Sequence, residues 1–328
     1  MQQCVIRDAI TVSILVLVLV LVLVLLLAMR VAQTVRGGAQ TVMRGGTQLF
    51  DPMRASKEFR REILSAIRHQ RSRRVLETVI SAHPPVCDAA ILARLRAVAA
   101  PPRAAPASRR HARAAALDKW PLIAERMRGA SASASASAAA PRTCLDIGCA
   151  DGSITAAVAD KLGLPPDRAL ACDIVDRVAP DARARIQFAQ STATRLPFAD
   201  ASVDLVTMNM VAHHFSDPAA MFREARRVSR AGALLLLREH DPPPGQLAAT
   251  TKRLNIEHAL WACIYNQEQT PEEFLADYRA PGGYAHYRPL AAFVGELAAA
   301  GFRLVDRDWP CENDSNYAAY ALFEAVDN

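Results

Sequence analysis

The chain contains one long apolar run near its start and several short apolar runs further on, and these runs predict its helices and strands. The first run, Ala9 to Met29, contains 21 residues without a charge and has no polar face. A helix of that length spans ~30 Å, which is the thickness of a bilayer core. From residue 144 onward, apolar runs of strand length alternate with segments of helical period. This alternation predicts an α/β fold with a parallel sheet covered by helices.

The short runs predict individual strands and helices. The expected strands lie at 144–146, 169–172, 205–208, 231–237, 302–309 and 317–324. The expected helices begin at or near Ile154, Asp217, Leu247, Thr270 and Pro289. The helix at Thr270 has an additional start signal, because Glu273 stands three residues later and completes a capping box.

The turn after the first expected strand carries the most informative motif. In Cys144-Leu-Asp-Ile-Gly-Cys-Ala-Asp-Gly152, an acid stands two residues before the first glycine. Dinucleotide-binding turns instead read G-x-G-x-x-G and place a phosphate on the helix N-terminus. A carboxylate at Asp146 would repel a phosphate, but it suits a ligand with ammonium and hydroxyl groups, such as S-adenosylmethionine. Asp173, about twenty residues past Gly152, has the place of an acid that binds ribose hydroxyls.

Two further motifs complete a family resemblance. Leu196-Pro-Phe-Ala-Asp-Ala-Ser-Val-Asp204 precedes the third expected strand, and Asn209-Met-Val-Ala-His-His-Phe215 follows it. In this order and spacing, residues 141–241, with an extension to 328, resemble class I S-adenosylmethionine-dependent methyltransferases of the type-11 subgroup. The resemblance implies a seven-stranded, Rossmann-like, doubly wound sheet whose last two strands form an antiparallel hairpin.

The resemblance also implies which residues bind S-adenosylmethionine. Asp146 would orient the methionine amino group, Asp173 would bind the ribose hydroxyls, and Asn209 would offer its main-chain carbonyl to the ammonium. The complete implied set is Asp146, Gly148, Ala150, Gly152, Asp173, Ile174, Thr192, Ala193 and Asn209. Two of these positions depart from the family pattern. Ala150 replaces a glycine, which is tolerable if its φ is negative, and Thr192 replaces an acid that reads the adenine amino group.

Catalytic candidates follow the fourth and fifth strands of the implied sheet. Methyl transfer is an in-line displacement, so the enzyme mainly aligns the acceptor and excludes water, and it needs a base only for a protonated acceptor. The candidates are His213, His214, Glu239, His240 and Asp241. We expect His213 to line the site and Glu239 or His240 to face the acceptor. Neighbouring histidines in one helical turn cannot both point into the site.

Two features of the N-terminal run favour an uncleaved membrane anchor over a signal peptide. The run is longer than the roughly 7 to 15 apolar residues of a signal peptide, and Met29-Arg30 ends it without a small-residue cleavage site. Before the run only Arg7, Asp8 and the amino terminus carry charge, whereas many basic residues follow it, so the positive-inside rule places the C-terminal part in the cytoplasm. We therefore expect a single-pass membrane protein, anchored through residues 9–29, with a cytoplasmic catalytic domain.

Charge is divided unequally between the two halves of the chain. Residues 1–140 contain 21 basic and 8 acidic residues, a net charge of +13, whereas residues 141–328 contain 18 and 25, a net charge of −7. Residues 54–74 form a dense basic stretch, which we expect on one or two short amphipathic helices. This stretch fits contact with anionic lipid beside the anchor, contact with RNA or DNA phosphates, or a solvated stalk.

These patterns divide the chain into an anchor at 1–30, a basic, helical or partly disordered stalk at 31–116, and a methyltransferase domain at 117–328. A low-complexity linker occupies residues 130–140. The seven cysteines are odd in number and lack disulfide-like spacing, so Cys144 and Cys149 are expected to be free thiols. No CxxC pair or His-x-x-x-His array accompanies them, and we expect no metal site.

The sequence thus predicts a membrane-anchored S-adenosylmethionine-dependent methyltransferase for a small-molecule or lipid-like acceptor. The run from Asn209 lacks the Pro-Pro-aromatic motif of enzymes that methylate nucleic-acid amines. The acidic catalytic half also disfavours a polyanionic substrate. Two alternatives stay open: an RNA or protein methyltransferase recruited by the basic arm, and a catalytically silent, membrane-tethered scaffold with the same fold.

Overall fold

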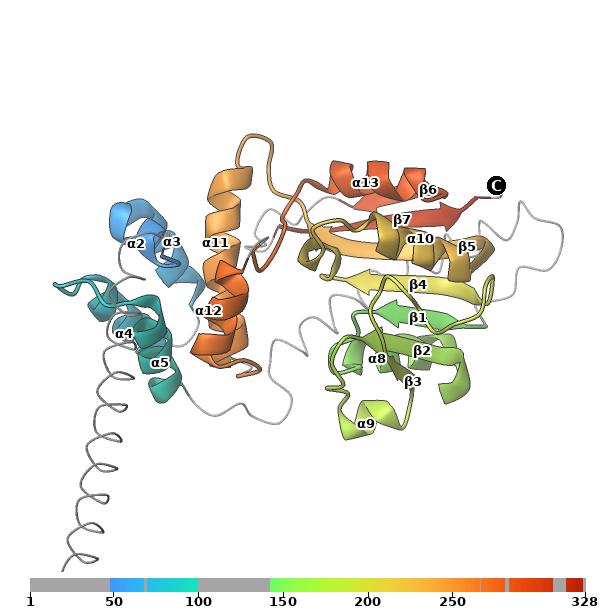
Figure 1. The fold of residues 1–328 in the computed structure, drawn as a ribbon, viewed down its shortest axis with the longest axis horizontal. Helices are drawn as coiled ribbons and strands as arrows, with labels where there is room; N and C mark the ends of the chain where they lie inside the picture. Colours follow the sequence, from blue (N-terminus) through green and yellow to red (C-terminus); the bar gives the residue numbers. More distant parts are fainter. Residues whose placement is uncertain are drawn as a thin grey trace, which may run out of the picture. The chain divides into compact units, whose positions relative to one another are not determined.

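A mixed β-sheet organises the catalytic half of the chain (Figure 1). The computed structural model describes residues 48–67, 70–99, 142–265, 267–280, 283–308 and 317–326. Among them, seven strands form one sheet in the order β3-β2-β1-β4-β5-β7-β6. The strands are β1 (Cys144–Ile147), β2 (Ala169–Asp173), β3 (Gln187–Gln190), β4 (Val203–Asn209), β5 (Ser229–His240), β6 (Phe302–Asp308) and β7 (Ala318–Ala325).

Strand direction places the functional edge of this sheet. Strands β1 to β5 run parallel to one another, whereas β7 runs antiparallel to both β5 and β6. The carboxyl ends of the five parallel strands therefore meet at one edge, which is where ligands bind in open α/β sheets. The predicted C-terminal hairpin is confirmed. Strand β3 was not predicted, because its residues are only partly buried and carry no apolar run.

Helices cover both faces of the sheet, because successive strand residues point to opposite sides. Leu145 and Ile147 belong to a core completed by α10 (Ala219–Val228) and α13 (Leu290–Ala299). Cys144 belongs to the opposite core, which includes residues of α8 (Ser153–Leu162) and α9 (Pro180–Arg183). This arrangement confirms the doubly wound sheet. The thiols of Cys144 and Cys149 are both free and buried, as predicted.

Two helices follow β5 and stand beyond the carboxyl ends of the strands in Figure 1. They are α11 (Leu247–Leu260), which continues as the π-helix η3 (Trp261–Tyr265), and α12 (Pro271–Arg279). The predicted capping box begins α12: the Thr270 hydroxyl accepts from the Glu273 N–H at 3.2 Å, and Glu273 accepts from the Thr270 N–H at 2.7 Å. Helix α11 thus brings side chains from a distant part of the sequence to the functional edge.

The N-terminal part of the structure is helical. Its helices are α2 (Asp51–Ala55), α3 (Lys57–Ala66), α4 (Gln70–Ile80) and α5 (Asp88–Val98). The chain divides into two units, Met1–Asp51 and Pro52–Asn328, so α3 to α5 belong to the same unit as the sheet. Helix α5 packs against α12 and η3, and Arg96 donates to the Gln269 carbonyl at 2.6 Å. This part of the expected stalk is thus packed against the C-terminal helices.

Several arginines of the 54–74 stretch bind the protein's own backbone. Arg60 donates to the Met53 carbonyl at 2.8 Å, and Arg73 donates to the Ile67 carbonyl at 2.8 Å. These bonds tie α3 and α4 to the ends of the helices that precede them, where carbonyl groups would otherwise be unpaired. Arg61 and Arg71, in contrast, are exposed.

The expected anchor at 9–29 and the linker at 130–140 lie outside the described residues. Within the described ranges, every helix is too short or too polar to cross a bilayer.

Candidate active site

A left-handed turn joins β1 to α8 at the functional edge. The main-chain N–H groups of Gly148 and Cys149 both donate to the Cys172 carbonyl, at 2.8 and 3.1 Å, so the turn folds back over the end of β2. Gly148 has a φ of +76°, and a Cβ there would lie 2.4 Å from Cγ2 of Val211. Gly152 has a φ of +73°, and a Cβ there would lie 2.7 Å from Cδ1 of Ile186. Both positions therefore require glycine.

Asp173 holds this turn from the neighbouring strand. Its Oδ2 accepts from the Ala150 N–H at 2.9 Å, and its Oδ1 accepts from the Val175 N–H at 3.1 Å. Ala150 has a φ of +49°, so the negative φ at which an alanine is readily tolerated is not found here. The physical reason is the tight path between two left-handed glycines, which holds the Ala150 amide toward Asp173 at the cost of left-handed strain.

Asp146 lies deeper than Asp173, with only 2% of its surface exposed. Its carboxylate accepts from the hydroxyl of Thr155 at 2.5 Å, the hydroxyl of Thr207 at 2.7 Å and the Nδ2 of Asn209 at 3.4 Å. Burial raises the pKa of Asp146, while these three hydrogen bonds oppose the shift. Asp146 therefore ties β1 to α8 and β4, and it orients Asn209 at the end of β4.

The two carboxylates lie on neighbouring strands at the same edge of the sheet. Ile147 of β1 pairs with Cys172 of β2, so Asp146 and Asp173 are each one residue from that pair. The buried Oδ1 of Asn209 makes no hydrogen bond to any described residue. The edge thus offers glycine backbone, two acids and one unpaired amide oxygen, which suits a ligand with hydroxyl and ammonium groups.

The remaining predicted cofactor residues follow β2 and β3. Ile174 is exposed over 67% of its surface, whereas Ala193 is buried. The Thr192 hydroxyl lies 3.3 Å from the Thr194 hydroxyl. These residues lie on the two connections that leave β2 and β3 at the functional edge, and the N–H of Ser191 donates to the Asp173 carbonyl at 2.9 Å. An exposed apolar side chain in this position can cover one face of a planar ring.

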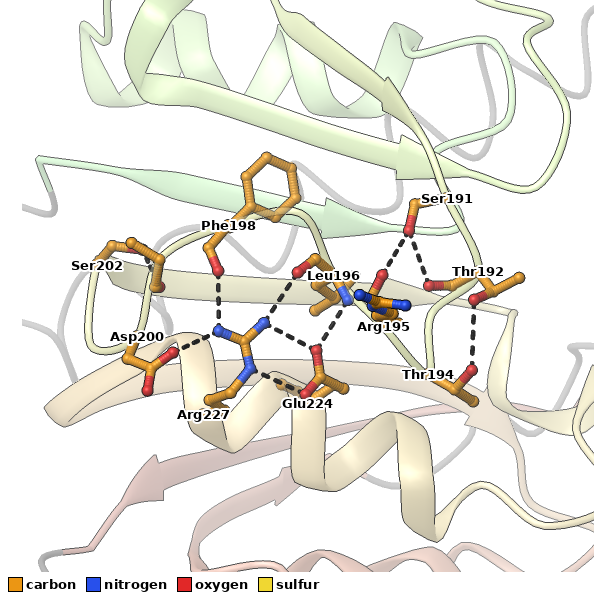
Figure 2. Close-up of polar contacts among 12 residues, drawn as sticks. Ser191, Thr192, Thr194, Arg195, Leu196, Phe198, Asp200, Ser202, Glu224 and Arg227 are labelled. Carbon is orange, nitrogen blue, oxygen red and sulfur yellow. Dashed lines mark hydrogen bonds and ion pairs between the residues drawn. The ribbon is translucent and has the colours of Figure 1, made fainter.

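Helix α10 fixes the loop that carries Thr192 and Ala193, as Figure 2 shows. Arg227 donates to the carbonyls of Leu196 and Phe198, both at 2.9 Å. It also pairs with Asp200 at 2.6 Å and with Glu224 at 2.8 Å. Glu224 in turn accepts from the Leu196 N–H at 2.8 Å. The Leu-Pro-Phe motif is thereby held in one conformation, a role of α10 that the motif alone did not reveal.

His213 and Glu239 form a buried pair at the other part of the edge. His213 lies in η2 (Ala212–His214), and Glu239 is near the end of β5; their side chains are 1% and 0% exposed. His213 Nδ1 and Glu239 Oε2 share a hydrogen bond of 2.7 Å, and Glu239 Oε1 accepts from the Ala212 N–H at 2.6 Å. Burial raises the pKa of Glu239 and lowers that of His213. Both carboxylate oxygens of Glu239 therefore contact η2.

Two further histidines surround this pair. The ring centroid of His213 lies 4.9 Å from that of His240 and 5.4 Å from that of His258. His258, on α11, shares a hydrogen bond between its Nδ1 and the hydroxyl of Tyr287. Burial lowers the pKa of His258 as well. The structure thus joins three imidazoles from η2, β5 and α11.

The other catalytic candidates have different positions. His214 is exposed and meets the ring of Tyr284 edge-on, and its ring centroid lies 4.2 Å from that of His213. Asp241 accepts from the Leu290 N–H at 2.8 Å and pairs with Arg307 at 2.7 Å. Asp241 therefore holds the start of α13 and strand β6.

Comparisons with known proteins identify a methyltransferase domain in this chain. A family model described as a methyltransferase domain matches residues 145–237. The demethylmenaquinone methyltransferase of Deinococcus radiodurans is 31% identical over 173 residues, which cover 46% of this chain and 71% of that protein. An uncharacterized methyltransferase of Mycobacterium sp. (strain JLS) is 37% identical over 101 residues, which cover 29% of this chain and 38% of that protein.

A solved structure of a methyltransferase from Methanosarcina mazei is also similar. Its sequence identity is 21% and its TM-score 0.41, and the match covers 58% of this chain and 95% of that one. The class that the sheet order and the glycine turn define is the class I, Rossmann-like methyltransferase. The chain belongs to the S-adenosylmethionine-dependent methyltransferases of this class, on the strength of the Deinococcus relative and the domain match.

The family implies S-adenosylmethionine as the methyl donor. The match to individual relatives is nevertheless partial. The chain spans 38%, 23% and 54% of the lengths of three relatives, from Mycobacterium sp., Bacillus subtilis and Mycolicibacterium paratuberculosis.

Proposed function

We propose that this protein transfers the methyl group of S-adenosylmethionine to a small-molecule or lipid-like acceptor, at the carboxyl edge of its sheet. The observation that carries the proposal is the juxtaposition of Asp146 and Asp173 around a turn that only glycine can form at Gly148 and Gly152. When bound, S-adenosylmethionine supplies a sulfonium methyl group that is open to in-line attack.

The residues present fit this donor. Asp173 and the bare turn at Gly148 offer a carboxylate and a flat backbone surface for a nucleoside, and Ile174 offers an exposed apolar side chain beside them. Asn209 has an unpaired buried amide oxygen near Asp146, which suits an ammonium group. The turn and the loop fixed by Arg227 would orient the donor, since alignment is the main requirement of methyl transfer.

The acceptor would approach from the side of His213 and α11. In a methyltransferase whose acceptor arrives protonated, His213 is the base that we predict, because Glu239 orients its ring and its Nε2 has no hydrogen-bond partner among the described residues. Water is excluded from this part of the edge, as His213, Glu239 and His240 are all buried.

A lipid-like acceptor is supported by the relatives and by the sequence. Relatives from Deinococcus and Mycolicibacterium are named demethylmenaquinone methyltransferases. Demethylmenaquinone is an isoprenoid quinone and is therefore the acceptor to test first. A membrane anchor at residues 9–29 would place the domain beside such molecules, with the domain on the cytoplasmic side.

Donor binding tests the proposal directly. Calorimetry of the full chain with S-adenosylmethionine is expected to give a dissociation constant in the micromolar range. Asp173→Asn should weaken binding about 10- to 100-fold, because a hydrogen bond to a charged group contributes about 1.5–3 kcal/mol. Asp176→Asn is the matched control, since Asp176 also accepts from a main-chain N–H two residues later, that of Val178 at 3.3 Å, but does not hold the glycine turn. Undetectable binding, or equal loss in both variants, would favour a catalytically silent scaffold.

Methyl incorporation identifies the acceptor. Full-length protein with labelled S-adenosylmethionine is incubated with lipid, RNA, protein and small-metabolite fractions, and with demethylmenaquinone. Label in the lipid or metabolite fraction is expected. Label confined to RNA or protein would replace our acceptor class by the alternative in which the basic arm recruits the substrate.

The location is tested separately. We expect the full chain to stay with membranes after alkaline extraction and a variant without residues 9–29 to be released. Glycosylation reporters in the C-terminal half should remain unmodified if that half is cytoplasmic. Release of the full chain, or modified reporters, would refute the anchor or its orientation.

A further inference from the structure

Three histidines from separate elements converge at the acceptor side of the functional edge. His213 comes from η2, His240 from the end of β5 and His258 from α11. One ring nitrogen from each lies within 4.8 Å of those from the other two. In a tetrahedral Zn²⁺ site the Zn–N bonds are ~2.0–2.1 Å long, so the ligand nitrogens lie closer to one another than 4.8 Å. Small rotations of the three side chains would bring their nitrogens to that spacing.

Hydrogen bonds engage one ring nitrogen in two of the three histidines. The Nδ1 of His213 is bonded to Glu239, and the Nδ1 of His258 is bonded to Tyr287. Each of these rings therefore has its Nε2 left for another partner. The Nε2 of His213 is buried and makes no hydrogen bond within the described part of the chain. A buried nitrogen lone pair without a partner costs free energy, which a ligated ion would recover.

Glu239 provides the second shell that metal-binding histidines usually have. A carboxylate bonded to the far nitrogen of the ring fixes the tautomer and raises the basicity of the ligating nitrogen. Glu239 also accepts hydrogen bonds from the main-chain N–H groups of Ala212 at 2.6 Å and of His213 at 3.3 Å. Among the described residues, no lysine or arginine forms an ion pair with it. A divalent cation beyond His213 would offset its buried charge.

We propose that His213, His240 and His258 bind a divalent transition-metal ion, with Glu239 and Tyr287 orienting two of the rings. Three imidazoles favour a borderline ion such as Zn²⁺ over Mg²⁺ or Ca²⁺, which prefer oxygen ligands. Three protein ligands also leave a fourth position open, as in catalytic rather than structural sites. No short sequence motif of metal ligands marks this cluster, because its successive members lie 27 and 18 residues apart.

A metal ion here would change the assignment of roles at the acceptor side. The lone pair of His213 Nε2 cannot serve both as a metal ligand and as a general base. An acceptor oxygen at the open position would instead lose its proton more readily through coordination. The metal site itself does not depend on methyl transfer, so it can be tested without substrate.

Direct metal titration is the test. Full-length, tag-free protein is treated with a chelator, dialysed, and titrated with Zn²⁺ by calorimetry and with Co²⁺ by visible absorption. We expect one ion per chain and the intense absorption of low-coordinate Co²⁺. His258→Gln should weaken Zn²⁺ binding at least 100-fold, and Glu239→Gln about 10- to 100-fold. His214→Gln is the matched control, because His214 neighbours the cluster but lies outside it, and it should bind as the parent protein does.

Donor binding by the same samples separates folding from metal binding. His258→Gln is expected to keep its affinity for S-adenosylmethionine, which shows that the variant is folded. Absence of a stoichiometric ion in the parent protein, or equal affinity in His258→Gln and His214→Gln, would overturn the metal site. Metal binding without any binding of S-adenosylmethionine would support the metal site and refute the proposed methyl transfer.

Discussion

The two parts of the functional edge are built on different principles. The donor side consists of a turn and two acids within about thirty residues, and it depends on backbone conformation at Gly148, Ala150 and Gly152. The acceptor side consists of buried rings from three elements and depends on side-chain contacts such as that between His213 and Glu239. The difference implies that mutations on the donor side should change donor affinity, whereas those on the acceptor side should leave it unchanged.

The largest effect is expected for Gly148→Ala on the donor side. The new Cβ would lie 2.4 Å from Val211 and at a φ of +76°, so we expect a loss of about 3 kcal/mol or more in unfolding free energy and no measurable donor binding. Chemical denaturation and calorimetry measure both. Gly163→Ala is the control, because Gly163 has a φ of +67° with open space around it. A similar loss in both variants would mean that backbone strain, rather than the contact with Val211, is decisive.

Arg227→Gln tests whether α10 supports the donor side from a distance. The change removes the bonds to the Leu196 and Phe198 carbonyls shown in Figure 2 and leaves Glu224 without its cation. We expect donor affinity to fall about 10-fold, with a loss of about 1–3 kcal/mol in stability. Arg223→Gln changes an exposed arginine of the same helix and serves as the comparison. Unchanged donor affinity in Arg227→Gln would show that the loop keeps its shape without this support.

Tyr287→Phe tests the acceptor side. Loss of the hydroxyl leaves the Nδ1 of His258 without its bond, so we expect stability to fall by about 1–2 kcal/mol while donor affinity stays within twofold. Tyr284→Phe retains the ring that contacts His214 and should have little effect. A tenfold change in donor affinity for Tyr287→Phe would contradict our expectation that mutations on the acceptor side leave donor binding unchanged.

The smallest effect is expected for Ala150→Gly, and its sign is opposite. Glycine relieves the left-handed strain at a φ of +49°, which should raise the unfolding free energy by about 0.5–1 kcal/mol and tighten donor binding slightly. Ala201→Gly is the control, because Ala201 has a φ of +45° outside the site. It should raise stability similarly without changing donor affinity. Destabilisation by Ala150→Gly would mean that the alanine methyl packs usefully.

The donor side could be predicted from the sequence because its residues are close together in the chain and backbone geometry restricts which residue types they can be. The glycines of the first turn and the acid that ends β2 mark it, and the structure places Asp146 and Asp173 as neighbours. The conformation of Ala150 was not predictable from residue type, since it follows from the bond between its N–H and Asp173.

The acceptor side was only partly readable. His213 and Glu239 were chosen because they follow strand ends, but their mutual bond depends on the pairing of β4 with β5. His258 looked like one polar residue on a helix face, and Tyr287 like part of an aromatic-rich loop. Nothing local marks residues as partners when they lie 29 positions apart.

The sequence by itself determined the class of fold, the donor and the strand-end acids, because periodic apolar runs and left-handed turns restrict which residues are allowed at each position. Tertiary structure alone decided that α3 to α5 pack in the same unit as the sheet and that three imidazoles meet beside Glu239. Such contacts between distant segments depend on how whole elements pack, and that packing leaves no periodic trace in the chain.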